Sequence, residues 1–156
     1  TQKTAYAILS GLVGSEMCIR DSSSIVSITP LHANEGAQGV VKERMDKFKI
    51  SKKMMQTIHK SIQREDFETI EKSATTLYNW SKEMIKYFPE GSDVPPSEAS
   101  TDIWLDPEGF KKAVNNFELA SLKLINNSKE KDFDKTVDSF RSLAGTCKGC
   151  HQKFRN

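Results

Sequence analysis

The sequence has few cysteines, no long apolar run and no block of basic residues. Only three cysteines occur in 156 residues. Two of them lie in one short motif, so a disulfide framework is not expected. No apolar run reaches the ~18 residues that a membrane-spanning helix needs, so we expect no membrane span. Basic and acidic side chains nearly balance, at 23 and 21, and without a basic cluster we expect no nucleic-acid partner.

Sets of catalytic side chains are missing as well. The predicted inner helix faces carry no paired carboxylates, and no set of serine, histidine and acid is found. We therefore predict that the protein is not an enzyme. No β-strand alternation occurs, so we expect an all-α fold that forms one domain.

Apolar residues recur at steps of three and four, which predicts four amphipathic helices. The expected ranges are residues 38–62, 66–88, 107–127 and 129–155. The short turn between the first two helices favours an antiparallel, up-down-up-down four-helix bundle. Residues 89–105 show no period and predict a long connection. The residues expected on the inner face of the last helix are Phe133, Val137, Phe140, Ala144, Cys147, His151 and Phe154.

The stretch Cys147-Lys148-Gly149-Cys150-His151 is the c-type haem attachment pattern. Each thiol can add to one vinyl group of the porphyrin, and the adjacent imidazole then reaches one axial face of the iron. A zinc site needs a second ligand pair, and a thioredoxin-like site needs a βαβ setting. The motif therefore predicts one covalent haem c near one end of the bundle, bound through Cys147 and Cys150 with His151 as axial iron ligand. A second axial ligand is expected from upstream, or the sixth position is empty.

The first 33 residues differ from the rest of the sequence. Residues 1–22 resemble translated sequencing-adapter read-through, with a genuine leader as the alternative, so Cys18 is expected to have no function. Residues 23–33 are interpreted as the remnant of a secretory signal peptide. The mature domain is expected to span residues 34–156. Covalent haem attachment takes place outside the bacterial cytoplasmic membrane, so we expect a periplasmic protein.

Over about residues 37–156 the sequence resembles cytochrome c′ and its class II relatives. The matching positions besides the attachment motif are Arg44, Tyr87-Phe88-Pro89, Ile103-Trp104, Asp106, Phe110 and Arg155. The resemblance implies a four-helix bundle that holds a haem. The residues implied to form the haem pocket are Arg44, Phe48, Phe88 and Arg155.

The resemblance also bears on the sixth iron position. In that family, the residue four positions after the helical arginine faces the iron opposite the axial histidine. Here this residue is Phe48, which cannot bind iron, so the resemblance implies a five-coordinate, high-spin iron. Met45, one turn earlier, is the rival ligand and would give a low-spin electron carrier. Arg44 and Arg155 are each expected to contact the haem or, alternatively, to be surface residues.

The functions implied by the resemblance are one-electron transfer with redox partner proteins and binding of nitric oxide or carbon monoxide. It also implies a possible homodimer formed through the first two helices. Tyr78 and Trp80, expected to be exposed, are candidate dimer contacts. Their alternative role is partial burial against the first helix or the long connection.

Overall fold

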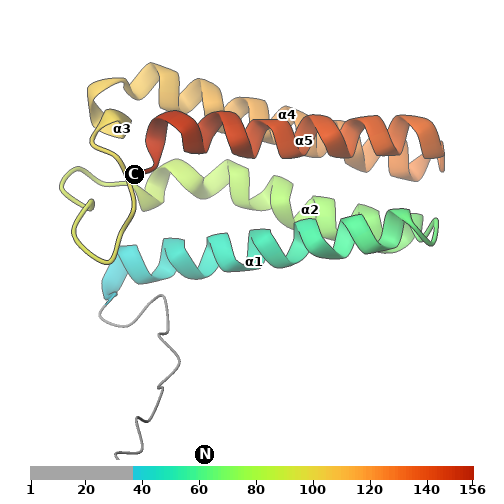
Figure 1. Cartoon of the computed structure of the whole chain (residues 1–156), viewed down its shortest axis with the longest axis horizontal. Helices are drawn as coiled ribbons and strands as arrows, with labels where there is room; N and C mark the ends of the chain where they lie inside the picture. The colour runs from blue at the N-terminus through green and yellow to red at the C-terminus, as the bar shows by residue number, and fades with distance from the viewer. Residues whose placement is uncertain (1–36) are drawn as a thin grey trace, which may run out of the picture. The chain divides into compact units, whose positions relative to one another are not determined.

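The computed structural model describes residues 37–156, which form a four-helix bundle with neighbouring helices in opposite directions (Figure 1). The expectations for residues 1–33 lie outside this range. The elements are α1 (Gly39–Ile62), α2 (Phe67–Glu83), the 3₁₀ helix η1 (Met84–Tyr87), α3 (Asp102–Leu105), α4 (Pro107–Lys129) and α5 (Phe133–Phe154). The described range contains no strand, and the predicted all-α bundle is confirmed.

Aspartate side chains begin three of the helices. Asp66, Asp106 and Asp132 each accept a hydrogen bond from the backbone N–H three residues further on. These bonds satisfy donors that a helix start leaves without intrahelical partners. In α4 the Asp106 carboxylate lies where a Cβ at Gly109 would be, so a larger residue at this position would have to displace it.

The second predicted helix changes its geometry before its expected end. The α-helix ends at Glu83 and the chain continues as η1. Pro89 disfavours the α conformation at the residue before it, and Phe88 has φ −124° and ψ 56°. In the long connection that follows, α3 is an element that the sequence pattern did not predict.

The third predicted helix extends past its expected end at Asn127 to Lys129. Asn127 and Ser128 are buried within α4. The Asn127 amide Nδ2 donates to Ser139 Oγ at 2.5 Å, and Ser128 Oγ donates to the Leu124 carbonyl at 2.7 Å. Because tertiary and local hydrogen bonds satisfy these side chains, they do not compete with the helix. Accordingly, α5 begins later than predicted, at Phe133.

The buried apolar residues of the second and third helices follow the predicted steps of three and four. The apolar residues buried there are Ile70, Ala74, Leu77, Met84, Phe110, Val114, Phe117 and Leu124. The predicted inner face of the last helix is confirmed only in part, because Phe154 is buried and Phe140 and Cys147 pack against the core. Thr136, Ser139 and Leu143 are buried, whereas Ala144 and His151 are exposed. Because α5 packs extensively on α4 and only sparsely on α1, its face toward α4 is the buried one.

Trp80 is buried, with 4% of its surface exposed, so the prediction of an exposed residue was wrong. Its ring lies edge-on to Phe48, with 5.6 Å between centroids, and to Tyr87, at 5.1 Å. The alternative prediction, that Trp80 packs against the first helix, is confirmed. Tyr78 is half-buried.

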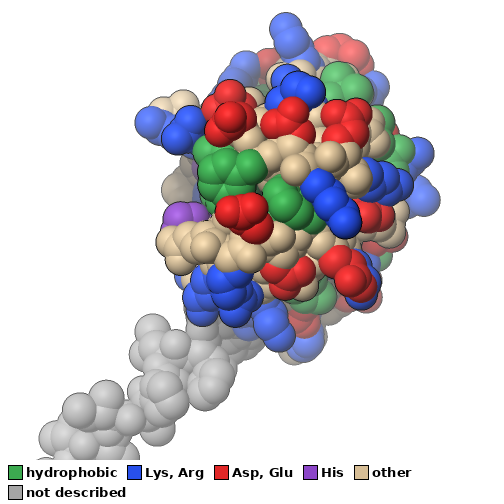
Figure 2. Space-filling model, turned by 90° about the vertical axis from the view of Figure 1, so that its right-hand side faces the viewer, with side chains coloured by type: hydrophobic (Ala, Val, Ile, Leu, Met, Phe, Trp, Pro, Cys, Tyr) green, Lys and Arg blue, Asp and Glu red, His purple; other side chains and the backbone are tan. Residues whose placement is uncertain are grey.

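The surface carries charges of both signs. Figure 2 shows acidic and basic side chains interspersed on the end of the bundle where α1 and α4 end and α2 and α5 begin. This pattern agrees with the balanced composition of 23 basic and 21 acidic residues. No helix within residues 37–156 has the length and apolar character needed to cross a membrane.

Candidate haem-attachment site

The two thiols of the attachment motif lie in the last two turns of α5. Cys147 and Cys150 are three residues apart, so they are neighbours on the helix surface. Both are half-buried free cysteines that pack against the hydrophobic core. Burial raises the pKa of the Cys147 thiol. Burial and the nearby Cys147 raise the pKa of Cys150 to about 11, so both thiols are neutral at pH 7.

His151 follows directly and is exposed. Partial burial of its ring lowers the pKa of the imidazole, and the positive charge of Arg155 lowers it further, whereas Glu98 opposes both effects. The imidazole is therefore neutral at pH 7, which is the form that binds metals.

A series of aromatic rings connects α1 to the end of α5. Phe48 of α1 lies 6.3 Å from Phe88, Phe88 lies 5.0 Å from Phe110 of α4, and Phe110 lies 5.3 Å from Phe154, all measured between ring centroids. Phe154 lies three residues after His151. The structure thus brings Phe48 and Phe88, both predicted pocket residues, to the end of the bundle that contains the attachment motif.

Met45 and Phe48 differ in their surroundings. Phe48 packs against the hydrophobic core, whereas Met45 is half-buried and is not part of the core cluster or of the apolar residues packed on it within the described range. His59 is exposed, and its ring stacks on Phe140 with 6.1 Å between ring centroids.

Arg44 is buried, with 2% of its surface exposed, so a surface ion pair is excluded. Its guanidinium lies 4.7 Å above the Phe88 ring. Its amino groups donate to Ser92 Oγ at 2.7 Å, to the Ser92 carbonyl, to Ser97 Oγ at 2.6 Å and to the Tyr87 carbonyl at 3.2 Å. Burial lowers the pKa of Arg44, opposed by the charge of Asp93. Arg44 therefore fastens α1 to the connection that follows η1.

Arg155 is exposed and pairs with Glu98. Its Nε donates to Glu98 Oε2 at 2.7 Å, and a terminal amino group donates to the same oxygen. Nearby, the Lys153 ammonium donates to the carboxylate of Asp106. These contacts fasten the end of α5 to the connection and to the start of α4.

These residues fit a covalently bound haem. Within residues 37–156 no group of three or more His, Cys, Asp or Glu side chains could hold a metal ion. One neutral imidazole beside two thiols suits a haem iron, because the porphyrin ring supplies the other ligands of the metal. The sparse packing of α1 on α5 leaves half-buried apolar side chains, among them Phe48 and Phe140, on facing helices. Arg44 places a positive charge among them with no carboxylate within ion-pair distance in the described chain.

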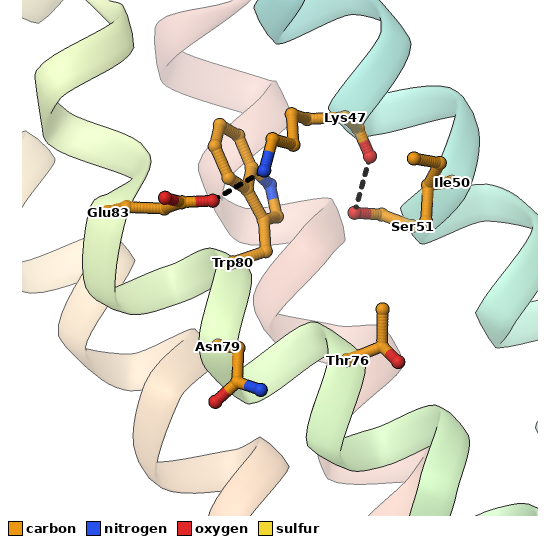
Figure 3. A pocket seen from close by; sticks show the side chains of 7 residues that line it. All are labelled: Lys47, Ile50, Ser51, Thr76, Asn79, Trp80 and Glu83. Carbon is orange, nitrogen blue, oxygen red and sulfur yellow. Dashed lines mark hydrogen bonds and ion pairs between the residues drawn. The ribbon is translucent and has the colours of Figure 1, made fainter.

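A cavity of about 210 Å³ lies between α1 and α2 (Figure 3). The side chains that line it are Lys47, Ile50, Ser51, Thr76, Asn79, Trp80 and Glu83. Lys47 Nζ lies 2.6 Å from Glu83 Oε1, and this hydrogen bond is the main cause that raises the pKa of Lys47. The cavity contains none of the predicted haem-pocket residues.

The sequence pattern did not identify Ser92, Ser97 and Glu98 as site residues. Glu98 lies 57 positions from its partner Arg155, in a segment without periodicity. The only signal in the sequence was a set of small polar residues in a connection, and this feature is common to most loops.

The fold and the motif define a c-type haem protein built on an antiparallel four-helix bundle. A family model described as Cytochrome C' matches residues 39–155. The chain therefore belongs to the cytochrome c′ family, whose members bind a covalent haem c with its iron.

Individual relatives agree with this assignment. Cytochrome c′ of Rhodospirillum rubrum is 36% identical over 69 residues, which are 44% of this chain and 47% of that protein. Cytochrome c′ of Rubrivivax gelatinosus is 39% identical over 59 residues, 38% of this chain and 46% of that protein. The matched segments thus span about half the length of these relatives. The crystal structure of the Rubrivivax gelatinosus protein covers 75% of this chain and 94% of its own, with a TM-score of 0.68 and 26% identity.

Proposed function

We propose that this chain binds one covalent haem c through Cys147 and Cys150, with His151 as the axial ligand and no protein ligand on the opposite face. Bound haem supplies a one-electron couple and an open iron position for a diatomic gas. The observation that supports this proposal best is the position of Phe48. This side chain of α1 packs in the ring series, and it has no atom that binds iron.

The proposed roles are one-electron transfer and binding of nitric oxide or carbon monoxide in the periplasm. Apolar side chains around an open iron position favour neutral diatomic gases over anions, because they offer no donor to replace the hydration of an anion. A similar solved structure, with 22% identity and a TM-score of 0.68, is a nitric oxide complex of a cytochrome c′ variant from Alcaligenes xylosoxidans. Neither role makes the protein an enzyme.

Arg44, Phe88 and Arg155 complete the proposed pocket. Arg44 is a buried cation beside Phe88, and a haem propionate would offer it the carboxylate that it otherwise lacks in the described chain. The alternative function is a low-spin electron carrier with Met45 as the sixth ligand. Met45 is half-buried on α1, one turn before Phe48.

An optical spectrum of the purified ferrous protein separates the two functions. We expect broad high-spin bands in the parent protein, whereas a sharp low-spin α band without added ligand would contradict the five-coordinate state. Phe48→Met should introduce a sixth ligand and convert the spectrum to low spin. Met45→Ala is the matched control and should leave the parent spectrum unchanged. Replacement of both Cys147 and Cys150 by Ser should remove the haem mass from the intact protein in mass spectrometry.

We further propose that the α1 and α2 face forms a homodimer. A similar solved cytochrome c′, with 17% identity and a TM-score of 0.70, is described as having ligand-controlled dimer dissociation. On this chain the α1 and α2 face exposes Ile50 at 48% beside the cavity of Figure 3. Because Trp80 is buried, the proposed dimer contact would be made by the other residues that line that cavity. Sedimentation analysis distinguishes the dimer from the monomer.

A further inference from the structure

The outer face of α4 carries a stripe of uncharged side chains that stays exposed. Leu119 and Leu122 are 56% and 38% exposed, and Asn115 and Asn126 on either side of them are exposed as well. The four residues follow steps of four, three and four, so they lie on one face of the helix. Along a length of about 17 Å, this face therefore presents two leucines between two amides.

Two charged residues flank this stripe, and neither Glu118 nor Lys123 has an ion-pair partner within residues 37–156. They lie five positions apart, whereas side chains that meet on one helix are three or four apart. Leu119 and Leu122 have the spacing of the a and d positions of a heptad. Glu118 then occupies the g position before them and Lys123 the e position after them, on opposite sides of the stripe.

A second copy of α4 that runs in the same direction would complete both features. In parallel pairs of helices, a residue at g faces the e position five residues later on the other helix. Glu118 of each copy would therefore lie beside Lys123 of the other, and the leucines would pack across the two-fold axis. Asn126 falls at an a position, where a single asparagine favours one register and one number of helices. In an antiparallel pair, by contrast, like flanks would meet and the two copies of Glu118 would repel each other.

We propose that α4 is a self-association surface through which two copies of this chain pair in parallel, with the leucine pair at the centre and Glu118 of each copy beside Lys123 of the other. This contact is separate from the α1 and α2 face, because α1 and α4 do not contact each other within the described chain and lie on opposite sides of the bundle in Figure 1. Only four positions of the stripe are uncharged. The interface is therefore small, and we expect a reversible dimer at high protein concentration.

The test is sedimentation velocity of the purified protein over a wide range of concentration. Ile50→Glu is present in every sample, so that the contact proposed for the α1 and α2 face is removed. In this background, Leu119→Glu should raise the dissociation constant of the dimer at least about tenfold, because the two new carboxylates would face each other across the axis. Leu105→Glu is the matched control, since Leu105 is 78% exposed in α3, and it should leave the dissociation constant unchanged.

Charge reversal tests the direction of the pairing. Glu118→Lys and Lys123→Glu should each weaken the dimer, and the double reversal should restore it, with effects that shrink as ionic strength rises. Circular dichroism checks that each variant keeps its helices. A protein with Ile50→Glu that stays monomeric at every concentration, an equal loss in Leu105→Glu, or no rescue by the double reversal would overturn the inference. Absence of covalent haem would instead overturn the proposed function, on which this contact does not depend.

Discussion

Buried hydroxyl groups at individual positions differ in how well they are satisfied. Ser61 and Thr136 are fully buried, and their hydroxyl oxygens have no hydrogen-bond partner among the described residues. By contrast, Ser139 Oγ accepts a hydrogen bond from the Asn127 amide and donates to the Lys135 carbonyl at 2.7 Å. An unsatisfied buried hydroxyl costs free energy that a satisfied one does not. Serines with equal burial are therefore expected to respond in opposite ways to removal of the hydroxyl.

Ser61→Ala should raise the free energy of unfolding by up to ~1 kcal/mol, because it removes an unpaired polar atom. Ser139→Ala, the matched substitution, should lower it by about 1–2 kcal/mol, because it leaves the Asn127 amide with one partner fewer. Urea denaturation of both variants measures the difference. A loss of stability in Ser61→Ala equal to that in Ser139→Ala would show that Ser61 has a partner.

The sequence predicted the single residues whose chemistry depends on local spacing. The positions of Cys147, Cys150 and His151 follow from a motif, whereas Phe48 was expected only because the sequence resembles cytochrome c′. The partners of Arg44 and Arg155 could not be predicted, since they come from a connection with no period. Hydrogen bonds such as Arg44 to Ser92 depend on how that connection folds back over α1, which local spacing does not determine.

At the scale of single helices, α4 begins with a close contact. The Asp106 carboxylate accepts the Gly109 N–H at 2.9 Å, and it also accepts a hydrogen bond from Lys153. The Lys153 bond and then the Gly109 bond lower the pKa of Asp106 below its usual 3.8. The stabilisation from this carboxylate is therefore fully present above pH ~4 and is lost as the pH falls through the lowered pKa.

Gly109→Ala should destabilise the protein although alanine favours helices, because the new Cβ displaces the Asp106 carboxylate. Gly145→Ala is the control, since a Cβ at Gly145 in α5 meets no atom within 4 Å. It should stabilise the protein by about 0.5–1 kcal/mol, the usual gain in an exposed helix. Thermal unfolding at pH 7 and near pH 3 measures both. The penalty of Gly109→Ala should shrink in acid, and a penalty independent of pH would argue against loss of the cap.

The elements were predicted well where one face of a helix is buried by two neighbours. The buried residues of α2 and α4 follow the predicted steps, because both helices pack on two others along most of their length. In α5 the predicted face is buried only in part, because one of its two neighbours contributes little packing. The periodicity of a sequence indicates a face but not how much of it each neighbour covers.

For the whole molecule, the uneven packing of the four helices is the main feature. α2 and α4 pack closely, as do α4 and α5, whereas α1 is held mainly by α2. Arg44 adds a second fastening for α1 at the end near the attachment motif. The proposed haem would complete the remaining interface, between α1 and α5.

Hydrogen exchange in the variant that lacks both Cys147 and Cys150 tests whether α1 is packed less firmly than the other helices. Without covalent haem, backbone amides in α1 should exchange at least tenfold faster than those in α2 and α4, because α1 can open without unpacking the other helices. In the haem-loaded parent the difference should be much smaller. Equal exchange of all four helices in the variant would show that the bundle opens as one unit.

The two tight turns of the bundle have a consequence for attaching the molecule to solid supports. Glu65 and Lys131 adopt left-handed conformations, with φ 53° and 55°, in the turns after α1 and α4. Both turns lie at the end opposite the attachment motif, and His151 is roughly 27 Å from the start of α5 at Phe133, at ~1.5 Å per residue. A protein coupled to an electrode through Lys131 would keep its proposed iron site at the far side of the bundle. Coupling through Lys148 would bring that site close to the conductor, so current should depend strongly on which lysine is used.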